Sequence, residues 1–226
     1  MVEKKMLKPK LILQFNEANF DFIKKYTEEY DLKGFKKIFK FKINIITSSE
    51  KKYEHLEPWI QWYSFYTSLP FVEQQTFHLG DCLKNDHPNF LNSLAKEGKK
   101  IGIFAAMNLK PSELFDVYIP DPWTEVRSDQ SLNSRFVSNA INQIVNQNAR
   151  FSINFSSLIG LFIILGFPRN LKDLKMLFLT MKSFFSRSRA RLAAYFDYFF
   201  TLYSIRRSNN NSHDVSLIFL NGLAHI

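Results

Sequence analysis

The sequence is poor in cysteine, glycine and acidic residues, and each shortage excludes a class of protein. Cys82 is the only cysteine, so the chain cannot build the intramolecular disulfide framework typical of small secreted domains. Seven glycines among 226 residues exclude collagen-like and glycine-linker sequences. The 21 Asp and Glu residues are outnumbered by 30 Lys and Arg residues, which gives a net charge of +9. A hydrophobic content of 46% excludes a wholly disordered chain.

The sequence also lacks a long apolar run. The basic start leads into the run Leu11–Phe15, which is too short for the core of a signal peptide. The longest apolar stretch, Ile153–Phe167, contains Asn154 and two serines and is followed by Pro168. A membrane-spanning helix needs about 20 apolar residues. We therefore expect a buried or interfacial helix in this stretch and a cytoplasmic protein.

Short apolar runs alternate with segments of helical periodicity. The expected strands are Lys10–Phe15, Ile43–Thr47, Lys100–Ala106 and Val215–Leu220. The expected helices are Ala18–Tyr30, Leu32–Phe41, Pro88–Lys99, Ser131–Asn148 and two helices within Lys172–Arg207. The segments expected to be irregular are Glu57–Ser68, Met107–Arg127 and Ser208–His213. Because helical crossovers separate the strands, the pattern predicts an α/β fold, a three-layer α/β/α sandwich around a mostly parallel sheet.

The expected domain organisation has three parts. Residues 1–150 form an α/β core that includes a candidate nucleophile loop. Residues 151–213 form a basic, Phe-rich helical insertion, and residues 214–226 return to the core as a strand. Only six residues follow that strand, so we expect the natural chain to continue beyond Ile226.

The basic segment 169–207 has three interpretations. It contains nine Lys and Arg residues against Asp173 and Asp197, and nine minus two gives +7 of the chain's +9. A solvated helical face is the simplest interpretation. Peripheral contact with an anionic membrane is the second, because cationic faces beside Phe-rich faces suit that interface. No nucleic-acid-binding motif accompanies the charge, so we expect no nucleic-acid partner.

Polar residues follow several of the expected strands. They are Asn16 with Glu17, the Ser48–Ser49 pair, and Asn221 with His225. Open parallel sheets bind their ligands beyond the carboxyl ends of their strands. Hydroxyl groups in Glu57–Ser68 complete a set suited to metal-assisted phosphoryl or sulfuryl transfer, in which a metal neutralises the oxyanion and a hydroxyl or water attacks.

Several segments, in this order, resemble a known family. They are the strand that ends at Asn16-Glu17, LEPWIQWYSFYTSL (56–69), FHLGD (77–81), KIGIFAAMN (100–108), VYIPDPWT (117–124) and FLNGLAHI (219–226). Together they resemble the alkaline phosphatase superfamily, in its type I phosphodiesterase/nucleotide pyrophosphatase-like and sulfatase-like branch. The resemblance implies an α/β/α sandwich and a metal-dependent hydrolase or transferase. It further implies a small anionic phosphate or sulfate ester as substrate and a divalent metal, Zn²⁺ with Mn²⁺ or Mg²⁺ as alternatives.

The resemblance also implies candidate site residues. The metal-binding Asp that ends the family's first strand corresponds to Asn16, with Glu17 beside it. The nucleophile corresponds to Tyr63 or Ser64, and we favour Ser64 because a primary hydroxyl reaches a metal more easily than a phenol. Asn221 and His225 have the spacing of the family's later Asp-x-x-x-His pair.

Departures from the family pattern at these positions support a different hypothesis. Amides replace carboxylates at Asn16 and Asn221, a phenol stands at Tyr63, and an alternative register would put Ala224 at the Asp position. These departures are typical of a catalytically degenerate member that acts as a binding or scaffold protein. We also expect residues 1–226 alone to have little hydrolase activity, since the family's remaining ligands would lie beyond Ile226.

Overall fold

The computed structural model describes residues 9–41, 45, 50–146, 154–166, 170–185 and 189–222. Within them, four parallel strands form one sheet in the order β1-β4-β2-β3. The strands are β1 (Lys10–Phe15), β2 (Ile101–Ala106), β3 (Val117–Pro120) and β4 (Val215–Leu220). The predicted strands at both ends of the chain and at Lys100–Ala106 are confirmed as neighbours. The predicted strand Ile43–Thr47 lies outside the described residues, apart from Ile45.

The last strand lies between the first two. β4 pairs with β1 along its whole length, from Lys10↔Val215 to Phe15↔Leu220, and with β2 on its other side. Every residue of β2 and β4 is buried. Their continuous apolar sequences are therefore those of parallel strands covered on both faces.

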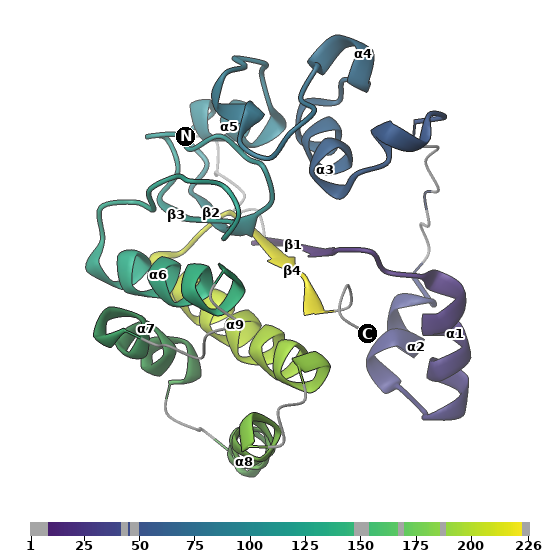
Figure 1. Cartoon of the computed structure of the whole chain (residues 1–226), viewed down its shortest axis with the longest axis vertical. Coiled ribbons are helices and arrows are strands. Elements are labelled where there is room, and N and C mark those ends of the chain that lie inside the picture. Colours follow the sequence, from purple (N-terminus) through teal and green to yellow (C-terminus); the bar gives the residue numbers. More distant parts are fainter. Residues whose placement is uncertain are drawn as a thin grey trace, which may run out of the picture.

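One face of the sheet is covered by α3 (Pro58–Thr67) and α5 (Phe90–Lys96) (Figure 1). Side chains from these helices and from alternate sheet positions form one apolar core that includes Tyr66, Leu91, Ile103 and Leu217. Shorter elements adjoin this layer: α4 (Phe71–Gln74) and the 3₁₀ turns Tyr53–His55 and Asp81–Leu83.

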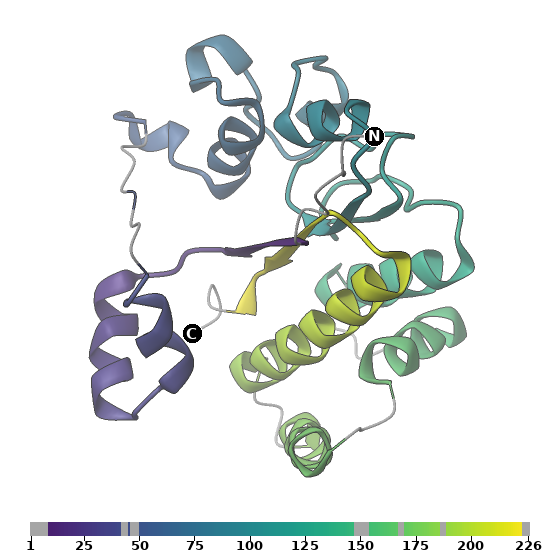
Figure 2. The same cartoon turned by 180° about the vertical axis from the view of Figure 1, so that it is seen from behind.

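The other face is covered by α6 (Leu132–Asn146), α7 (Phe155–Leu165) and α9 (Arg189–Asn211). Figure 2 shows these helices together on the side away from α3 and α5. α8 (Leu171–Phe185) packs against α9, whereas α1 (Phe20–Glu29) and α2 (Lys33–Ile38) follow the carboxyl end of β1. The predicted α/β/α sandwich is confirmed.

The longest apolar stretch forms the helix α7, which crosses α6 at close range. A Cβ atom on Gly160 would overlap the backbone carbonyl of Phe136, so only glycine permits this approach. The Ser157 hydroxyl donates to the Asn139 carbonyl at 3.1 Å across the same contact. Among the described residues, no helix is both long enough and apolar enough to cross a membrane.

Three segments expected to be irregular contain regular structure: Glu57–Ser68 and most of Ser208–His213 are helical, whereas Met107–Arg127 is irregular apart from one strand. Met107–Arg127 contains β3, a four-residue strand whose outer edge is covered because the Tyr118 N–H donates to the Asp129 carboxylate at 2.9 Å. Glu57–Ser68 is the helix α3, which Pro58 begins at a position that suits proline. Ser208–His213 begins as the last turn of α9. Each error has the same origin, because prolines, aromatics or polar residues concealed short elements that tertiary contacts stabilise.

Gly102 of β2 lies directly beneath a buried histidine. His213 is 3% exposed, and its Nε2 atom is 2.8 Å from the Asp116 carboxylate. A Cβ atom on Gly102 would overlap the imidazole Nδ1 atom. The missing side chain at Gly102 is therefore what allows His213 to pack on the sheet.

This packing predicts that Gly102→Ala destabilises the fold. The added methyl group must displace the imidazole, so the free energy of unfolding should fall by about 1–3 kcal/mol. Gly34→Ala is the matched control, because nothing lies within 4 Å of a Cβ atom there and alanine favours its helix. Urea unfolding measures both variants, and equal midpoints would contradict the steric explanation.

Candidate functional site

Two asparagines meet at the carboxyl edge of the sheet. Asn16 follows β1 and Asn221 follows β4, and the Asn16 side-chain Nδ2 donates to the Asn221 Oδ1 atom at 2.8 Å. The backbone N–H of Asn16 also donates to the Leu220 carbonyl at 3.0 Å, which extends the parallel ladder by one bond. The structure thus brings together two of the predicted site residues, separated by 205 positions in the sequence.

Helix α3 adds an indole to this pair. Trp62 Nε1 donates to the Asn16 Oδ1 atom at 3.0 Å. The Trp62 ring also packs edge-on against Phe219 of β4, with ring centroids 5.7 Å apart, and Trp123 meets Phe219 at 6.5 Å. The amide of Asn16 is therefore held from both sides, with its orientation fixed by one donor and one acceptor. This role of Trp62 depends on a tertiary hydrogen bond, which no local sequence pattern indicates.

A second buried polar pair, Gln14 with Tyr66, involves the residue two positions before Asn16. Gln14 and Asn16 share a face of the strand because side chains alternate. The Tyr66 hydroxyl of α3 donates to the Gln14 Oε1 atom at 2.9 Å, and burial raises the pKa of Tyr66. Among the described residues, no hydrogen-bond partner reaches Gln14 Nε2, although Gln14 is 2% exposed.

Asp121 ties together the loops that follow β2 and β3. Its carboxylate accepts the Asn108 N–H at 2.8 Å, and both the N–H and the hydroxyl of Thr124 at 2.7 and 2.8 Å. It also accepts the Trp123 N–H at 2.9 Å. Burial raises the pKa of Asp121, and the hydrogen bonds oppose that rise. Because four donors occupy its oxygens, this carboxylate organises the edge of the sheet.

Asn108 extends that organisation to α3. It has a positive φ of 55°, a conformation that asparagine tolerates better than most residues. Its side chain accepts the Gly80 N–H at 2.9 Å and donates to the Trp59 carbonyl at 3.2 Å. Asn108 and Asp121 both belong to segments that carry the family resemblance, but the resemblance does not indicate their hydrogen bonds. An Asp-x-x-Thr pattern after a strand is the signal that would have indicated the Asp121 turn.

The predicted nucleophiles lie within α3 and away from the asparagine pair. Ser64 is two positions from Trp62, so it lies on a different side of the helix. Its Oγ atom accepts a long hydrogen bond, 3.4 Å, from Gln74 Nε2. Tyr63 is buried, and this burial raises its pKa to about 12. The expected nucleophile loop is therefore a helix whose Trp62, rather than its Ser64, contacts Asn16.

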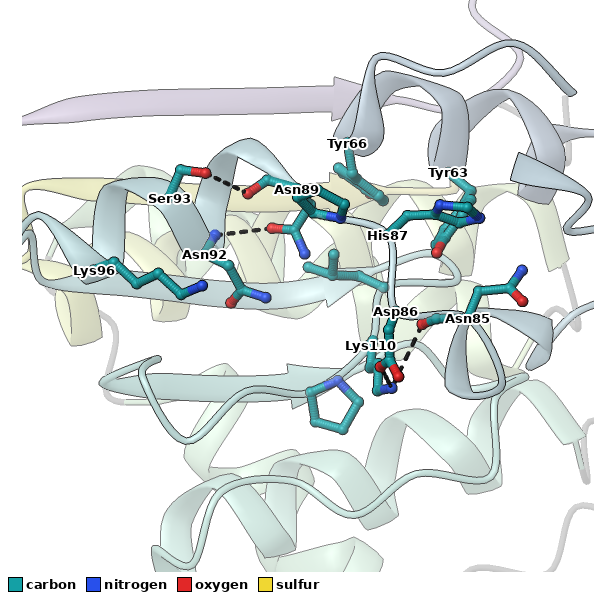
Figure 3. A pocket seen from close by; sticks show the side chains of 13 residues that line it. Tyr63, Tyr66, Asn85, Asp86, His87, Asn89, Asn92, Ser93, Lys96 and Lys110 are labelled. Atoms are coloured by element: carbon teal, nitrogen blue, oxygen red, sulfur yellow. Dashed lines mark hydrogen bonds and ion pairs between the residues drawn. The ribbon is translucent and has the colours of Figure 1, made fainter. Parts of the chain in front are cut away.

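Tyr63 instead lines a cavity of about 370 Å³ between α3, α5 and the loop that follows β2 (Figure 3). Its ring meets His87 edge-on at 6.3 Å, and Lys110 forms an ion pair with Asp86 at the cavity wall. Tyr66 also lines the cavity, while its hydroxyl bonds Gln14. Tyr66 therefore links the cavity to Gln14 of β1, whereas Trp62 contacts Asn16.

The remaining metal-ligand candidates are Glu17 and His225. Glu17 is exposed beside Asn16 and has a positive φ of 53°. His225 lies outside the described residues. In the part of the chain that the structure describes, no three His, Cys, Asp or Glu side chains form a metal-binding cluster.

The amide oxygens of Asn16 and Asn221 lie at this edge, each in a hydrogen bond. Asn16 Oδ1 accepts one hydrogen bond from Trp62, and Asn221 Oδ1 accepts one from Asn16. An amide oxygen has two lone pairs, and the hydrogen bond from Trp62 uses one of those on Asn16 Oδ1. Carboxylate and amide oxygens suit Mg²⁺ or Mn²⁺, whereas Zn²⁺ would require the nitrogen donor of His225.

Helix α9 fixes the chain just after β4. The Asp197 carboxylate accepts the Gly222 N–H at 2.6 Å and also bonds the Asn221 N–H. Burial raises the pKa of Asp197 to about 6, and the two backbone bonds oppose this rise. A Cβ atom on Gly222 would come within 2.5 Å of the Asp197 oxygen, so glycine is needed for the contact. Asp197 therefore positions the backbone that carries Asn221.

Comparison with protein-family models, with curated proteins and with solved structures gave no match to this chain. The assignment of a function accordingly depends on the residues of the site itself.

The raised pKa of Asp197 predicts that the stability of the fold depends on pH. Its pKa is higher in the folded chain, near 6, than the ordinary 3.8, so the folded state favours the protonated form. The contribution of this group to stability is therefore full below about pH 4 and is lost as the pH rises through 6. Asp197→Asn removes the titrating carboxyl group and with it this pH dependence. Between about pH 4 and pH 6, the free energy of unfolding of the wild type should therefore fall relative to that of the variant. Urea unfolding along a pH series measures the difference, and parallel curves would contradict the prediction.

Proposed function

We propose that the protein is a metal-dependent hydrolase or transferase of phosphate or sulfate esters, with its active site at the carboxyl edge of β1 and β4. The observation that carries the proposal is the hydrogen bond between Asn16 and Asn221. It brings polar residues from the first and last strands side by side where open parallel sheets bind ligands. The resemblance of the flanking segments to the alkaline phosphatase superfamily supplies the reaction class.

The metal would be held by Asn16, Glu17 and Asn221, with His225 as a further ligand. A divalent metal at such a site supplies charge neutralisation for the ester oxygens and lowers the pKa of water. Mg²⁺ or Mn²⁺ suits the oxygen donors, and Zn²⁺ suits the set that includes His225.

The chain's own residues contribute orientation and charge. Trp62 donates to Asn16 Oδ1 and so fixes which way the amide points. Asp121 keeps the adjoining loops in place through its four hydrogen bonds. The net charge of +9, which residues 131–213 supply, favours the approach of anions to the molecule as a whole. Water is the proposed nucleophile, because the hydroxyls of Ser64 and Tyr63 project from other sides of α3 than Trp62.

A second candidate function is ligand binding without turnover. It is favoured by the chemistry of the pair, since Asn16 and Asn221 are neutral and hydrogen-bond each other. The indoles of Trp62 and Trp123 pack around Phe219 beside them. A site of amides and indoles is suited to hold a polar ester, including a glycan-linked one, without cleaving it.

The two functions predict different behaviour of the full-length protein. We expect hydrolysis of one of three substrates, bis(4-nitrophenyl) phosphate, 4-nitrophenyl phosphate or 4-nitrophenyl sulfate, with added Zn²⁺, Mn²⁺ or Mg²⁺. Asn16→Ala and Asn221→Ala should each raise the metal concentration for half-maximal activity by about 10- to 100-fold. Asn209→Ala removes an exposed amide on α9 and is the matched control.

The outcomes separate the hypotheses. Ester binding in calorimetry that needs Asn16, without turnover under any metal, supports the binding protein. Turnover that survives both asparagine substitutions places the active site elsewhere. Ser64→Ala decides the nucleophile, because retained turnover supports water and lost turnover in a folded variant supports the serine.

A further inference from the structure

Helix α8 turns its apolar side outward. Leu171, Leu174, Phe178 and Met181 are all exposed, and Leu171 is 85% exposed. Their spacing of three, four and three residues places them on one side of the helix, the side that a surface helix normally buries. The inward side carries Asp173 and Ser183, which are 5% and 4% exposed.

Helix α7 exposes a similar row. Phe155, Leu158 and Phe162 face outward, while the small residues Ser157 and Gly160 face α6. Figures 1 and 2 show α7 and α8 at the end of the molecule opposite α3 and α4. We refer to the exposed side chains of these two helices as the α7–α8 surface: Phe155, Leu158, Phe162, Leu171, Leu174, Phe178 and Met181.

The surroundings of this surface are basic without exposed acidic groups. Residues 131–213 contain 11 Lys and Arg residues and two acidic ones, and 11 minus 2 equals the chain's entire net charge of +9. Asp173 accepts the Tyr198 hydroxyl at 2.8 Å, and Asp197 accepts the Gly222 N–H. Both carboxylates therefore point inward, whereas Lys172, Lys175 and Lys182 are exposed.

The exposed apolar residues of α1 and α2 have more balanced charge around them. α1 and α2 expose Phe20 and Phe22, at 68% and 60%. Residues 20–41, however, contain four acidic residues among six lysines. Charge therefore distinguishes the α7–α8 surface from the exposed apolar residues of α1 and α2.

We propose that the α7–α8 surface docks the protein onto an anionic lipid bilayer. A helix with Leu and Phe on one side and lysines beside them is the type that lies in the membrane interface. Each lysine near an anionic surface strengthens binding by roughly fivefold. A second copy of the chain is a poorer occupant, because two basic surfaces of the same sign would repel each other.

Vesicle flotation of the full chain tests the proposal. The protein should float with vesicles that contain about 30% phosphatidylserine, should bind pure phosphatidylcholine far more weakly, and should be released at about 0.5 M NaCl. Phe162→Ser with Phe178→Ser should lower the partition coefficient at least about tenfold. Phe20→Ser with Phe22→Ser is the matched control, since all four rings are 60–68% exposed.

A charge variant keeps the test decisive if the Phe162/Phe178 variant fails to fold. Lys172→Gln, Lys175→Gln and Lys182→Gln together change only exposed side chains and should lower the partition coefficient roughly a hundredfold. The proposal is overturned if the wild type binds neither kind of vesicle. It is also overturned if the Phe20/Phe22 control variant loses as much binding as the Phe162/Phe178 variant. Concentration-dependent dimers without vesicle binding, seen in sedimentation equilibrium, would identify a second copy as the occupant and would also overturn it.

Discussion

The position of β4 between β1 and β2 is the constraint on which the rest of the structure depends. β1 has β4 as its hydrogen-bonded neighbour in the sheet, and β4 joins it to β2 and β3. The same pairing places Asn221 beside Asn16 and buries Phe219 against Trp62. Fold and candidate site therefore share one origin, the parallel register of the first and last strands.

The apolar runs, and the polar residues that follow them, predicted much of this arrangement. β1, β2 and β4 were predictable because strands buried on both faces have continuous apolar sequences. The meeting of Asn16 and Asn221 followed from their places after two such strands. β3 and α3 were not predictable in the same way. The four residues of β3 lie among prolines, and the aromatic-rich sequence of α3 has no simple apolar periodicity.

The polar contacts around the site could not be predicted from the sequence, for a different reason. Trp62 bonds Asn16 across 46 positions, and Asn108 bonds Trp59 across 49. No local pattern indicates such pairings, because each depends on how α3 packs on the sheet. Asp197 is similar, since its contact with Gly222 exists only when α9 lies against the end of β4. What the sequence did indicate was the basic charge of the helical segment 169–207.

The parallel pairing of β1 with β4 also affects how the protein is made. Residues 10–15 leave the ribosome about 205 residues before their partners at 215–220. At 5–20 residues per second, β1 waits roughly 10 to 40 s for the strand that completes it. Contacts of such long range also slow folding after release, because the chain must close a large loop before it gains the pairing. Until β4 is synthesised, β1 therefore lacks the neighbour whose backbone groups satisfy its own.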